Sequence, residues 1–480
     1  MDAIPSASPA PRPRALPALR HDSAGRRRVD YRAVFALAAP LFLNSGIQAV
    51  LNMTDTWFLG RISAQATAAV GAVFWFVIVI VLLLGGAAMA VQTLVAQAYG
   101  AGDRSRAAGM VWNGLWVVLA MSPLFVAAAF AGGWFLAPAK LPPELESMAL
   151  DYWFPRVAGS VAGVGLWCLT SFYNGIGRTG VTLALMTVVG LANLVLNQVL
   201  GFGFGLGVAG IAWATTAAQV LGLLLGLWTF LGPRTRRDFL SHRQWRPRLA
   251  PMTRTLALGL PMGLLPAADL IGTGLFQLMQ VDLGTVAGAA TQVTMMMTSI
   301  AYMPAIGIAS AGTTLVGQSI GAGDLDWARR LGNAAIGLTV GYMGLVSLLL
   351  ALAGPWSMPL FINPADPNAG AVIETAALLI WLGAAYPIFD GFNLGCGFAL
   401  RGAGDVRVPA LLTLALSWLG FLPLVHSLSF APGEGWVAWL PQFGLGVAGG
   451  WTALLIYVAL LGALMAWRWR SGAWRHIQLG

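Results

Sequence analysis

Long apolar segments recur along the chain, and polar, glycine-rich or arginine-rich segments separate them. Each apolar segment is long enough to cross a bilayer as a helix, which takes about 20 residues. The alternating segments of about ten residues that are typical of membrane β-barrels do not occur. We therefore expect an all-α polytopic membrane protein. The pattern predicts twelve spans, at residues 34–58, 68–96, 110–131, 153–172, 183–200, 208–230, 255–281, 290–316, 334–353, 374–399, 409–428 and 447–467.

The two halves of the chain repeat each other. The segment QAYGAGD, which ends at Asp103, returns as QSIGAGD, which ends at Asp324, and this pair of positions defines the register of the repeat. Both copies fall where a predicted span ends, so we expect the glycines to end one helix and the acid to cap the next. Six spans per half is an even number, so the halves enter the membrane in the same direction as parallel repeats. We expect two six-helix lobes with the substrate site between them.

This organisation divides the chain into five regions. We expect a disordered cytoplasmic arm, an N-terminal lobe, a basic cytoplasmic linker, a C-terminal lobe and a cytoplasmic tail. The arm and the linker each contain seven arginines, and the arm is also rich in proline. Their bounds are 1–32, 33–230, 231–254, 255–467 and 468–480.

Charge indicates how the chain lies in the membrane. Only 9% of the residues are charged, whereas soluble proteins have about 25%. All but Arg61, Lys140 and Arg156 of the 27 Lys and Arg residues fall on one predicted side. This asymmetry, rather than nucleic-acid binding, explains the net charge of +9, and it places both termini in the cytoplasm. The location expected is the inner (plasma) membrane.

Acidic residues inside the spans are the strongest candidates for function. Of the eighteen acids, only Asp55, Asp269 and Asp390 fall in the interior of apolar spans. A carboxylate at the centre of a membrane helix costs about 2.5–3.5 kcal/mol on insertion scales, and it marks a functional site by default. Tyr386 precedes Asp390 by four residues and Asn393 follows it by three, so the three side chains share one helical face.

Two of these acids extend stripes of other polar side chains. At 100° per residue, each stripe keeps to one side of its helix, within roughly 80° for the first span. Interhelical hydrogen bonding alone would also explain such stripes, but the added carboxylate favours a functional interpretation. The stripes are Asn44, Gln48, Asn52 and Asp55 in the first span, and Asp269, Thr273, Gln277 and Gln280 in the seventh.

Neutral oxygen ligands are available near the acids. Asn193 and Asn197 lie one turn apart in the fifth span, and Thr215 lies in the sixth. Such oxygens complete a sodium shell beside a carboxylate, or hydrogen-bond a protonated acid. Asp390 and Asp269 are the predicted Na⁺ ligands, and the coupling ion is Na⁺ or H⁺. No other cofactor is expected.

The repeats and the three acids resemble the multidrug and toxic compound extrusion (MATE) family, over residues 33 to about 467. In this resemblance Asp55, Asn193, Asn197 and Thr215 match the cation site of the N-terminal lobe. Some members carry an acid at the position of Asn197, so this residue is a departure from the pattern.

The acids of the second half point to one branch of that family. Asp269 and Asp390, with Tyr386 one turn before the latter, match the C-terminal cation site of the NorM-like branch. The resemblance implies a monomeric antiporter that expels cationic, amphipathic small molecules from the cell in exchange for Na⁺ or H⁺.

Three alternatives to a drug antiporter remain. A lipid-linked sugar or polysaccharide-precursor flippase of the same superfamily would need a basic cavity, whereas the charges expected inside the spans are acidic. A channel would need rings of selectivity residues from repeated subunits. A membrane enzyme would need a nucleophile with a base or a metal cluster, and the spans contain neither. An antiporter that is not an enzyme agrees best with the sequence.

Overall fold

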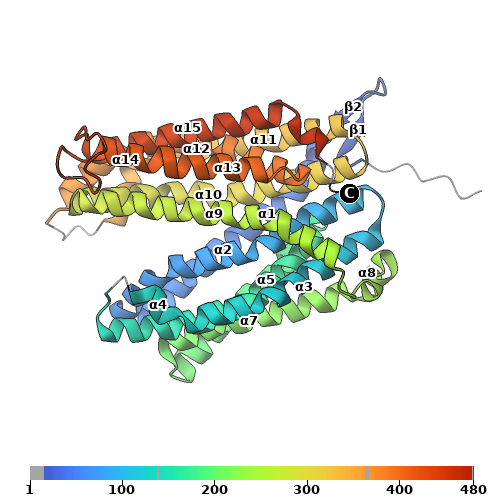
Figure 1. The fold of residues 1–480 in the computed structure, drawn as a ribbon, viewed down its shortest axis with the longest axis horizontal. Helices are drawn as coiled ribbons and strands as arrows, with labels where there is room; N and C mark the ends of the chain where they lie inside the picture. Colours follow the sequence, from blue (N-terminus) through green and yellow to red (C-terminus); the bar gives the residue numbers. More distant parts are fainter. Residues whose placement is uncertain (1–15, 138–139, 363–366, 478, 480) are drawn as a thin grey trace, which may run out of the picture.

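The computed structural model describes residues 16–137, 140–362, 367–477 and 479. Helices make up nearly all of this part, and they form two lobes (Figure 1). The first lobe contains α1 (Tyr31–Ile62), α2 (Ala64–Gly100), α3 (Arg104–Phe130), α4 (Gly132–Leu136), α5 (Pro143–Gly175), α6 (Thr179–Leu196), the π-helix η2 (Asn197–Gly203) and α7 (Gly207–Phe230).

The second lobe repeats this order after a linker. The linker contains α8 (Pro233–Phe239) and the 3₁₀-helix η3 (Ser241–Arg243). The lobe itself contains α9 (Leu249–Asp282), α10 (Thr285–Gly321), α11 (Leu325–Ser357), η4 (Met358–Phe361), α12 (Ala369–Ala403), α13 (Arg407–Ala415), the π-helix η5 (Leu416–Phe421), α14 (Leu422–Ser429), α15 (Gly446–Arg470) and η6 (Ala473–His476).

The twelve predicted spans are confirmed as long helices. Eleven helices of the described residues are long and apolar enough to cross a membrane, if α6 is counted with η2, and α13 with η5 and α14. The twelfth is α5, which has 33 residues but carries acids in its first turn. Most helices extend beyond their predicted ends, because polar residues continue the helix outside the apolar segment. The first helix of the second lobe, α9, accordingly begins at Leu249, inside the segment expected as linker.

The repeated GAGD segments have the predicted structural role. The side chain of Asp103 accepts a hydrogen bond from the backbone N–H of Arg106 and caps α3. Asp324 caps α11 in the same way by accepting from Trp327. The glycine before each acid has a positive φ, +81° at Gly102 and +88° at Gly323, which only glycine adopts at little cost.

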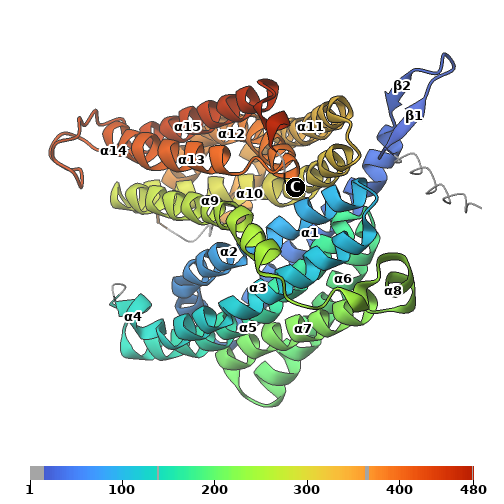
Figure 2. The ribbon, with the colours of Figure 1, turned by 45° about the vertical axis from the view of Figure 1, so that its right-hand side comes forward.

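The lobes meet at one end of the bundle and diverge toward the other (Figures 1 and 2). They meet at the end where α8, the N-terminal strands and the C-terminus lie, here called the basic end. They diverge at the end of α4 and α14, here called the far end. In the halves of the helices nearer the basic end, α2 packs against α9 and α10 against α1.

Glycines allow this close packing between the lobes. A Cβ on Gly86 of α2 would lie only 2.2 Å from the carbonyl oxygen of Gly259 on α9. Gly307 of α10 is the counterpart of Gly86 in the register of the repeat, and a Cβ on it would lie 2.5 Å from the carbonyl oxygen of Leu41 on α1. The repeat in the sequence is therefore also a repeat in the contacts between the lobes.

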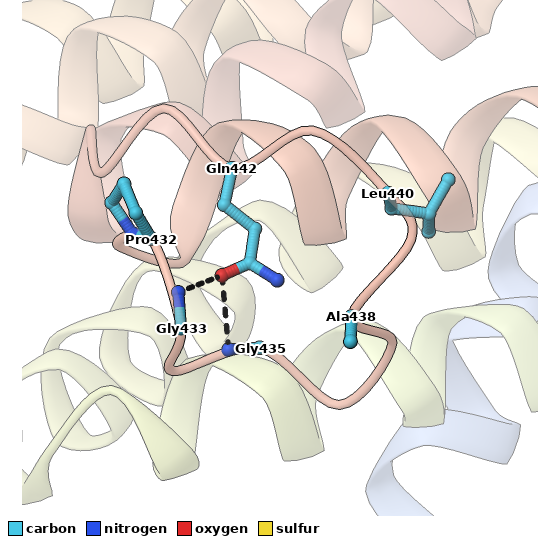
Figure 3. Close-up of a pocket in the computed structure, with 6 residues that line it drawn as sticks. All are labelled: Pro432, Gly433, Gly435, Ala438, Leu440 and Gln442. Atoms are coloured by element: carbon cyan, nitrogen blue, oxygen red, sulfur yellow. Dashed lines mark hydrogen bonds between the residues drawn. The ribbon is translucent and has the colours of Figure 1, made fainter.

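At the far end, a loop between α14 and α15 is ordered by polar contacts. The side-chain oxygen of Gln442 accepts hydrogen bonds from the backbone N–H groups of Gly433, at 2.8 Å, and Gly435, at 3.3 Å (Figure 3). Nε2 of His426 accepts another from Val437. The cavity inside this loop contains none of the three intramembrane acids, so it is not the candidate site.

The arm predicted to be disordered is folded where the structure describes it. Strands β1 (Leu19–His21) and β2 (Arg27–Val29) form an antiparallel hairpin before α1. Residues 1–15 lie outside the described residues. The prediction was wrong for 16–30 because the hairpin takes its apolar contacts from α10 and α11, far away in the sequence.

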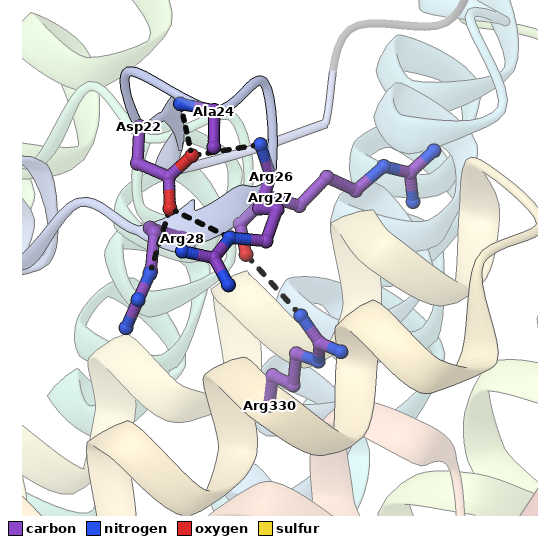
Figure 4. Close-up of polar contacts among 6 residues, drawn as sticks. All are labelled: Asp22, Ala24, Arg26, Arg27, Arg28 and Arg330. Carbon is purple, nitrogen blue, oxygen red and sulfur yellow. Dashed lines mark hydrogen bonds and ion pairs between the residues drawn. The ribbon is translucent and has the colours of Figure 1, made fainter.

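Polar contacts fix the hairpin to α11. Arg27 pairs with Asp324, and the indole N–H of Trp327 donates to the carbonyl oxygen of Pro17 at 2.9 Å. Arg330 donates to the carbonyl oxygen of Arg27 at 3.3 Å (Figure 4). Burial raises the pKa of Asp324, but hydrogen bonds from the Trp327 backbone and from Arg27 outweigh it, and the net pKa is lowered.

Asp324→Asn is expected to loosen the hairpin while keeping the helix cap, because asparagine still accepts from Trp327. Loss of a partly exposed ion pair predicts about 1.5-fold to fivefold faster exchange of the hairpin amides. Hydrogen exchange over residues 19–29 measures this, and Arg329→Gln, on the same helix, is the control. In the wild type the same loss is expected only as the pH falls below 3.8, through the lowered pKa. Unchanged exchange in Asp324→Asn would show that the ion pair does not hold the hairpin.

Candidate functional site

The first lobe brings four of the predicted residues together around Asp55. Nδ2 of Asn197 donates to Oδ1 of Asp55 at 2.6 Å, and the hydroxyl of Thr215 donates to Oδ2 at 3.2 Å. Asn193 closes the group by donating to Thr215 at 3.1 Å and accepting from Asn197 at 3.3 Å. The residues come from α1, α6, η2 and α7, so this polar cluster lies inside the first lobe.

Each lobe has a π-helix that contributes to its polar cluster or contacts a residue of it. Asn197 is the first residue of η2, and its amide oxygen is buried without a hydrogen-bond partner among the described residues. In the second lobe, η5 contains Phe421, whose ring stacks on Tyr457 at a centroid distance of 4.7 Å. π-Helical turns inside longer helices occur frequently at functional sites because they redirect side chains.

Arg156 is a neighbour of the Asp55 cluster that the sequence did not predict. Its positive charge interacts with Asp55, and its Nε and Nη1 atoms are buried without a hydrogen-bond partner in the described part of the chain. Arg401 of α12 likewise has a buried Nε, and its guanidinium lies 4.5 Å from the ring centre of Phe398. The expectation that all charges inside the spans are acidic is therefore wrong.

The second lobe contains Asp390 at the centre of α12, where only 3% of its surface is exposed. Nδ2 of Asn393 donates to Oδ1 of Asp390 at 3.0 Å, which confirms that the two share a face. Oδ2 is buried and has no hydrogen-bond partner among the described residues. A buried, unpartnered carboxylate oxygen is costly unless a proton or a cation occupies it.

Asp269 and three tyrosines lie within electrostatic range of this carboxylate. The hydroxyl of Tyr457 on α15 donates to Oδ1 of Asp269 at 2.9 Å. Asp269 and Asp390 interact electrostatically with each other and with Tyr302, Tyr386 and Tyr457. The predicted pair of acids and Tyr386 are thus brought together in one cluster.

The polar pattern of the sequence did not single out Tyr302 and Tyr457. The available signal was a phenol in an otherwise apolar span: the chain has only eight tyrosines, and three of them lie in this cluster.

Other polar residues of the two stripes have structural contacts. Gln280 donates to the hydroxyl of Ser429 at 3.4 Å, and Gln277 donates to Gln292 at 3.3 Å. The hydroxyl of Thr273 binds the carbonyl oxygen of Asp269 on its own helix. Asn52 is exposed. Interhelical hydrogen bonding, the alternative considered for the stripes, accounts for Gln277 and Gln280.

The cluster around Asp390 is suited to a monovalent cation or a proton. Two carboxylates offer negative charge, and the neighbouring amide and phenol groups offer neutral oxygens. In the described residues no three His, Cys, Asp or Glu side chains are placed to hold a metal ion together. Oxygen ligands with two carboxylates therefore favour Na⁺ or H⁺ over a transition metal.

Comparisons with known proteins agree with this arrangement. Residues 40–200 and 271–424 match the MatE family. The chain is 34% identical over 448 residues to the multidrug resistance protein NorM of Burkholderia vietnamiensis, covering 90% of this chain and 92% of that protein. It is 29% identical over 446 residues to the probable multidrug resistance protein NorM of Rhizobium meliloti (strain 1021), covering 91% and 92%.

A solved structure has the same fold. The crystal structure of MATE in complex with MaL6 superimposes with a TM-score of 0.82, covering 92% of this chain and 97% of that one. At 18% sequence identity, this likeness concerns the arrangement of the helices.

Proposed function

Because this chain belongs to the MatE family, within its NorM-like branch, we propose that it is a secondary antiporter that exports cationic, amphipathic drugs in exchange for Na⁺ or H⁺. The observation that carries this proposal is the buried Oδ2 atom of Asp390, which has no hydrogen-bond partner in the described part of the chain. A species that brings positive charge compensates a buried carboxylate more fully than the neighbouring phenol of Tyr386 does. The coupling ion and the cationic substrate both do so.

Competition for the carboxylates explains the coupling. Asp269 and Asp390 repel each other when both are ionised, and a bound cation or a shared proton relieves that repulsion. If the ion and the drug cannot occupy the two acids together, binding of one expels the other. Rocking of the two lobes about this site then exposes it to each side of the membrane in turn.

The Asp55 cluster has a related role in this proposal. Asn193, Asn197 and Thr215 leave Asp55 able to accept a cation, whereas Asn197 adds no second negative charge. Arg156 compensates part of the negative charge. We therefore assign to this cluster weaker ion binding than to the Asp390 cluster, and a part in holding the substrate.

The remaining alternatives have less support. The relatives reported above are named for multidrug resistance, and none of those names refers to a lipid-linked sugar, so a flippase is not favoured. Transport by exchange breaks no covalent bond, and it needs neither an enzyme's nucleophile nor a cofactor. The proposed partners are small cationic molecules and the bilayer, and one chain of two lobes is sufficient as a monomer.

The basic end is assigned to the cytoplasm, because arginines are concentrated in the N-terminal hairpin and in the linker that contains α8. His242→Cys, in the linker, is expected to react with an impermeant thiol reagent only after cells are opened. Ser147→Cys, at the start of α5, is expected to react in intact cells. Both positions are exposed, so accessibility to solvent does not separate them. Labelling of residue 242 but not 147 in intact cells would reverse the orientation.

The function itself is tested in proteoliposomes that contain the purified protein and a fluorescent organic cation. An imposed Na⁺ or H⁺ gradient is expected to accelerate movement of the dye against the ion. Protein-free liposomes and liposomes without a gradient are the controls. A rate of dye movement that is the same with and without either gradient would contradict the antiporter proposal.

A further inference from the structure

Hydrogen bonds join the lobes at the basic end, and their donors occupy equivalent positions of the internal repeat. The hydroxyl of Thr93 on α2 donates to the carbonyl oxygen of Arg401 on α12 at 2.9 Å. The hydroxyl of Thr314 on α10 donates to the carbonyl oxygen of Asn174 on α5, also at 2.9 Å. The two threonines occupy equivalent positions of the repeat, in the same register as Asp103 and Asp324. Each bond runs from one lobe to the other.

The glutamines of the repeated motif make a second pair of bonds. Nε2 of Gln97 donates to the carbonyl oxygen of Gly402 at 3.0 Å, and Nε2 of Gln318 donates to the carbonyl oxygen of Gly175 at 2.8 Å. Each glutamine is the first residue of its copy of the motif, so these two positions are also equivalent. All four acceptors lie in the last turn of α5 or α12, beyond the regular i to i+4 bonds of the helix. The carbonyls of Asn174 and Arg401 also accept from Gly177 and Gly404 in the turns that follow.

The two glycine-containing ends of α2 and α10 touch each other. A Cβ on Gly100 would lie 2.0 Å from the carbonyl oxygen of Gln318, and a Cβ on Gly321 would lie 2.0 Å from that of Gln97. Each copy of the motif thus supplies a glutamine that donates a hydrogen bond to the other lobe. It also supplies a glycine whose missing side chain allows α2 and α10 to pack closely. Capping of the next helix, its other role, does not require the glutamine.

Burial protects most of these hydrogen bonds from competition by water. Thr93 and Thr314 are completely buried, and Gln318 is 7% exposed. While the lobes are closed at this end, water does not replace the bonds of these three residues, and Gln97 is half-buried. Once the lobes part, water satisfies both donor and acceptor. The net strength of each bond is therefore modest, and the four together favour the closed arrangement without making it permanent.

We propose that Thr93, Gln97, Thr314 and Gln318, the interlobe cluster, are the gate residues of the basic end and set how often the protein opens there. The inference rests on the proposed transport by rocking lobes. Opening at the basic end must break all four bonds, because each joins one lobe to the other. The bonds are equivalent in pairs, so neither lobe alone controls the gate.

Spin-label distances measure this equilibrium directly, without substrate or coupling ion. Labels at Arg236→Cys on α8 and Arg329→Cys on α11, both exposed, report the separation of the lobes at the basic end after Cys168→Ala and Cys396→Ala. Thr93→Val and Thr314→Val each remove one hydroxyl at nearly constant volume. Thr314→Val also removes the acceptor of a 3.1 Å bond that Gln92 of α2 donates. Each is expected to raise the ratio of open to closed protein about threefold to tenfold, and the double variant by the product.

Thr452→Val is the matched control, because the hydroxyl of Thr452 binds Ala448 on its own helix. Gly100→Ala and Gly321→Ala test the same gate by steric contact rather than by hydrogen bonding, and both are expected to favour the open form. Distances unchanged in all four gate variants, or shifted equally by Thr452→Val, would overturn the inference. Shifted distances in a protein that shows no gradient-driven transport would instead refute the proposed antiport and leave the gate standing.

Discussion

Replacement of Asp390 by asparagine is expected to abolish the acceleration of dye efflux by an ion gradient. Asparagine keeps the contact with Asn393 but brings no negative charge to the buried position. Loss of a charged ligand in a buried site predicts a fall in cation affinity of about tenfold or more, which corresponds to roughly 1.4 kcal/mol. Gradient-stimulated dye flux in proteoliposomes measures the effect.

Asp269→Asn is expected to give a similar defect, because its carboxylate interacts with Asp390. The double variant is expected to add little to either single variant, since both acids serve one site. Asp282→Asn is the control: this acid binds the indole of Trp436 at the surface, 2.7 Å away, outside the cluster. Strictly multiplicative losses would show that the two acids act independently, and unaltered stimulation in Asp390→Asn would remove that residue from the mechanism.

Asp55→Asn is the second substitution expected to have a large effect, about tenfold or more in drug resistance. The fold is expected to persist, because asparagine can still accept from Asn197 and can donate to the hydroxyl of Thr215. Resistance to cationic dyes in cells that lack other efflux pumps measures the effect, with the amount of protein in the membrane determined alongside. Arg61→Gln, at the same end of α1, is the control for loss of a surface charge.

The role of Arg156 provides an internal check on Asp55. If the two charges compensate each other, Arg156→Gln alters dye resistance in the wild-type background more than in the Asp55→Asn background. Wild-type resistance in Asp55→Asn would end the hypothesis that the first lobe takes part in transport.

Local features of the sequence predicted most of the fold. Apolar runs of sufficient length must be helical in a bilayer, so the twelve helices followed from hydropathy alone. Asp103 and Asp324 were predicted as caps because capping depends on residues within one turn. Asn393 was placed beside Asp390 for the same reason, since helical spacing determines which neighbours share a face.

Contacts between segments far apart in the chain could not be predicted from the sequence. Tyr457 reaches Asp269 on α9 from α15, near the end of the chain, and nothing close to either residue in the sequence indicates the contact. Arg156 was predicted to lie on the side of the membrane opposite to most arginines, yet two of its nitrogens are buried. The hairpin before α1 is stabilised by α10 and α11 rather than by its own short strands.

Competition between ion and drug for the two acids can be tested by equilibrium binding, without any transport. The purified protein is titrated with a fluorescent organic cation at increasing Na⁺ concentration and, separately, at decreasing pH. If ion and drug compete, the apparent Kd for the dye rises with Na⁺ or with H⁺ in the wild type, and this dependence disappears in Asp390→Asn. A dye affinity that is independent of both ions in the wild type would show that they do not compete.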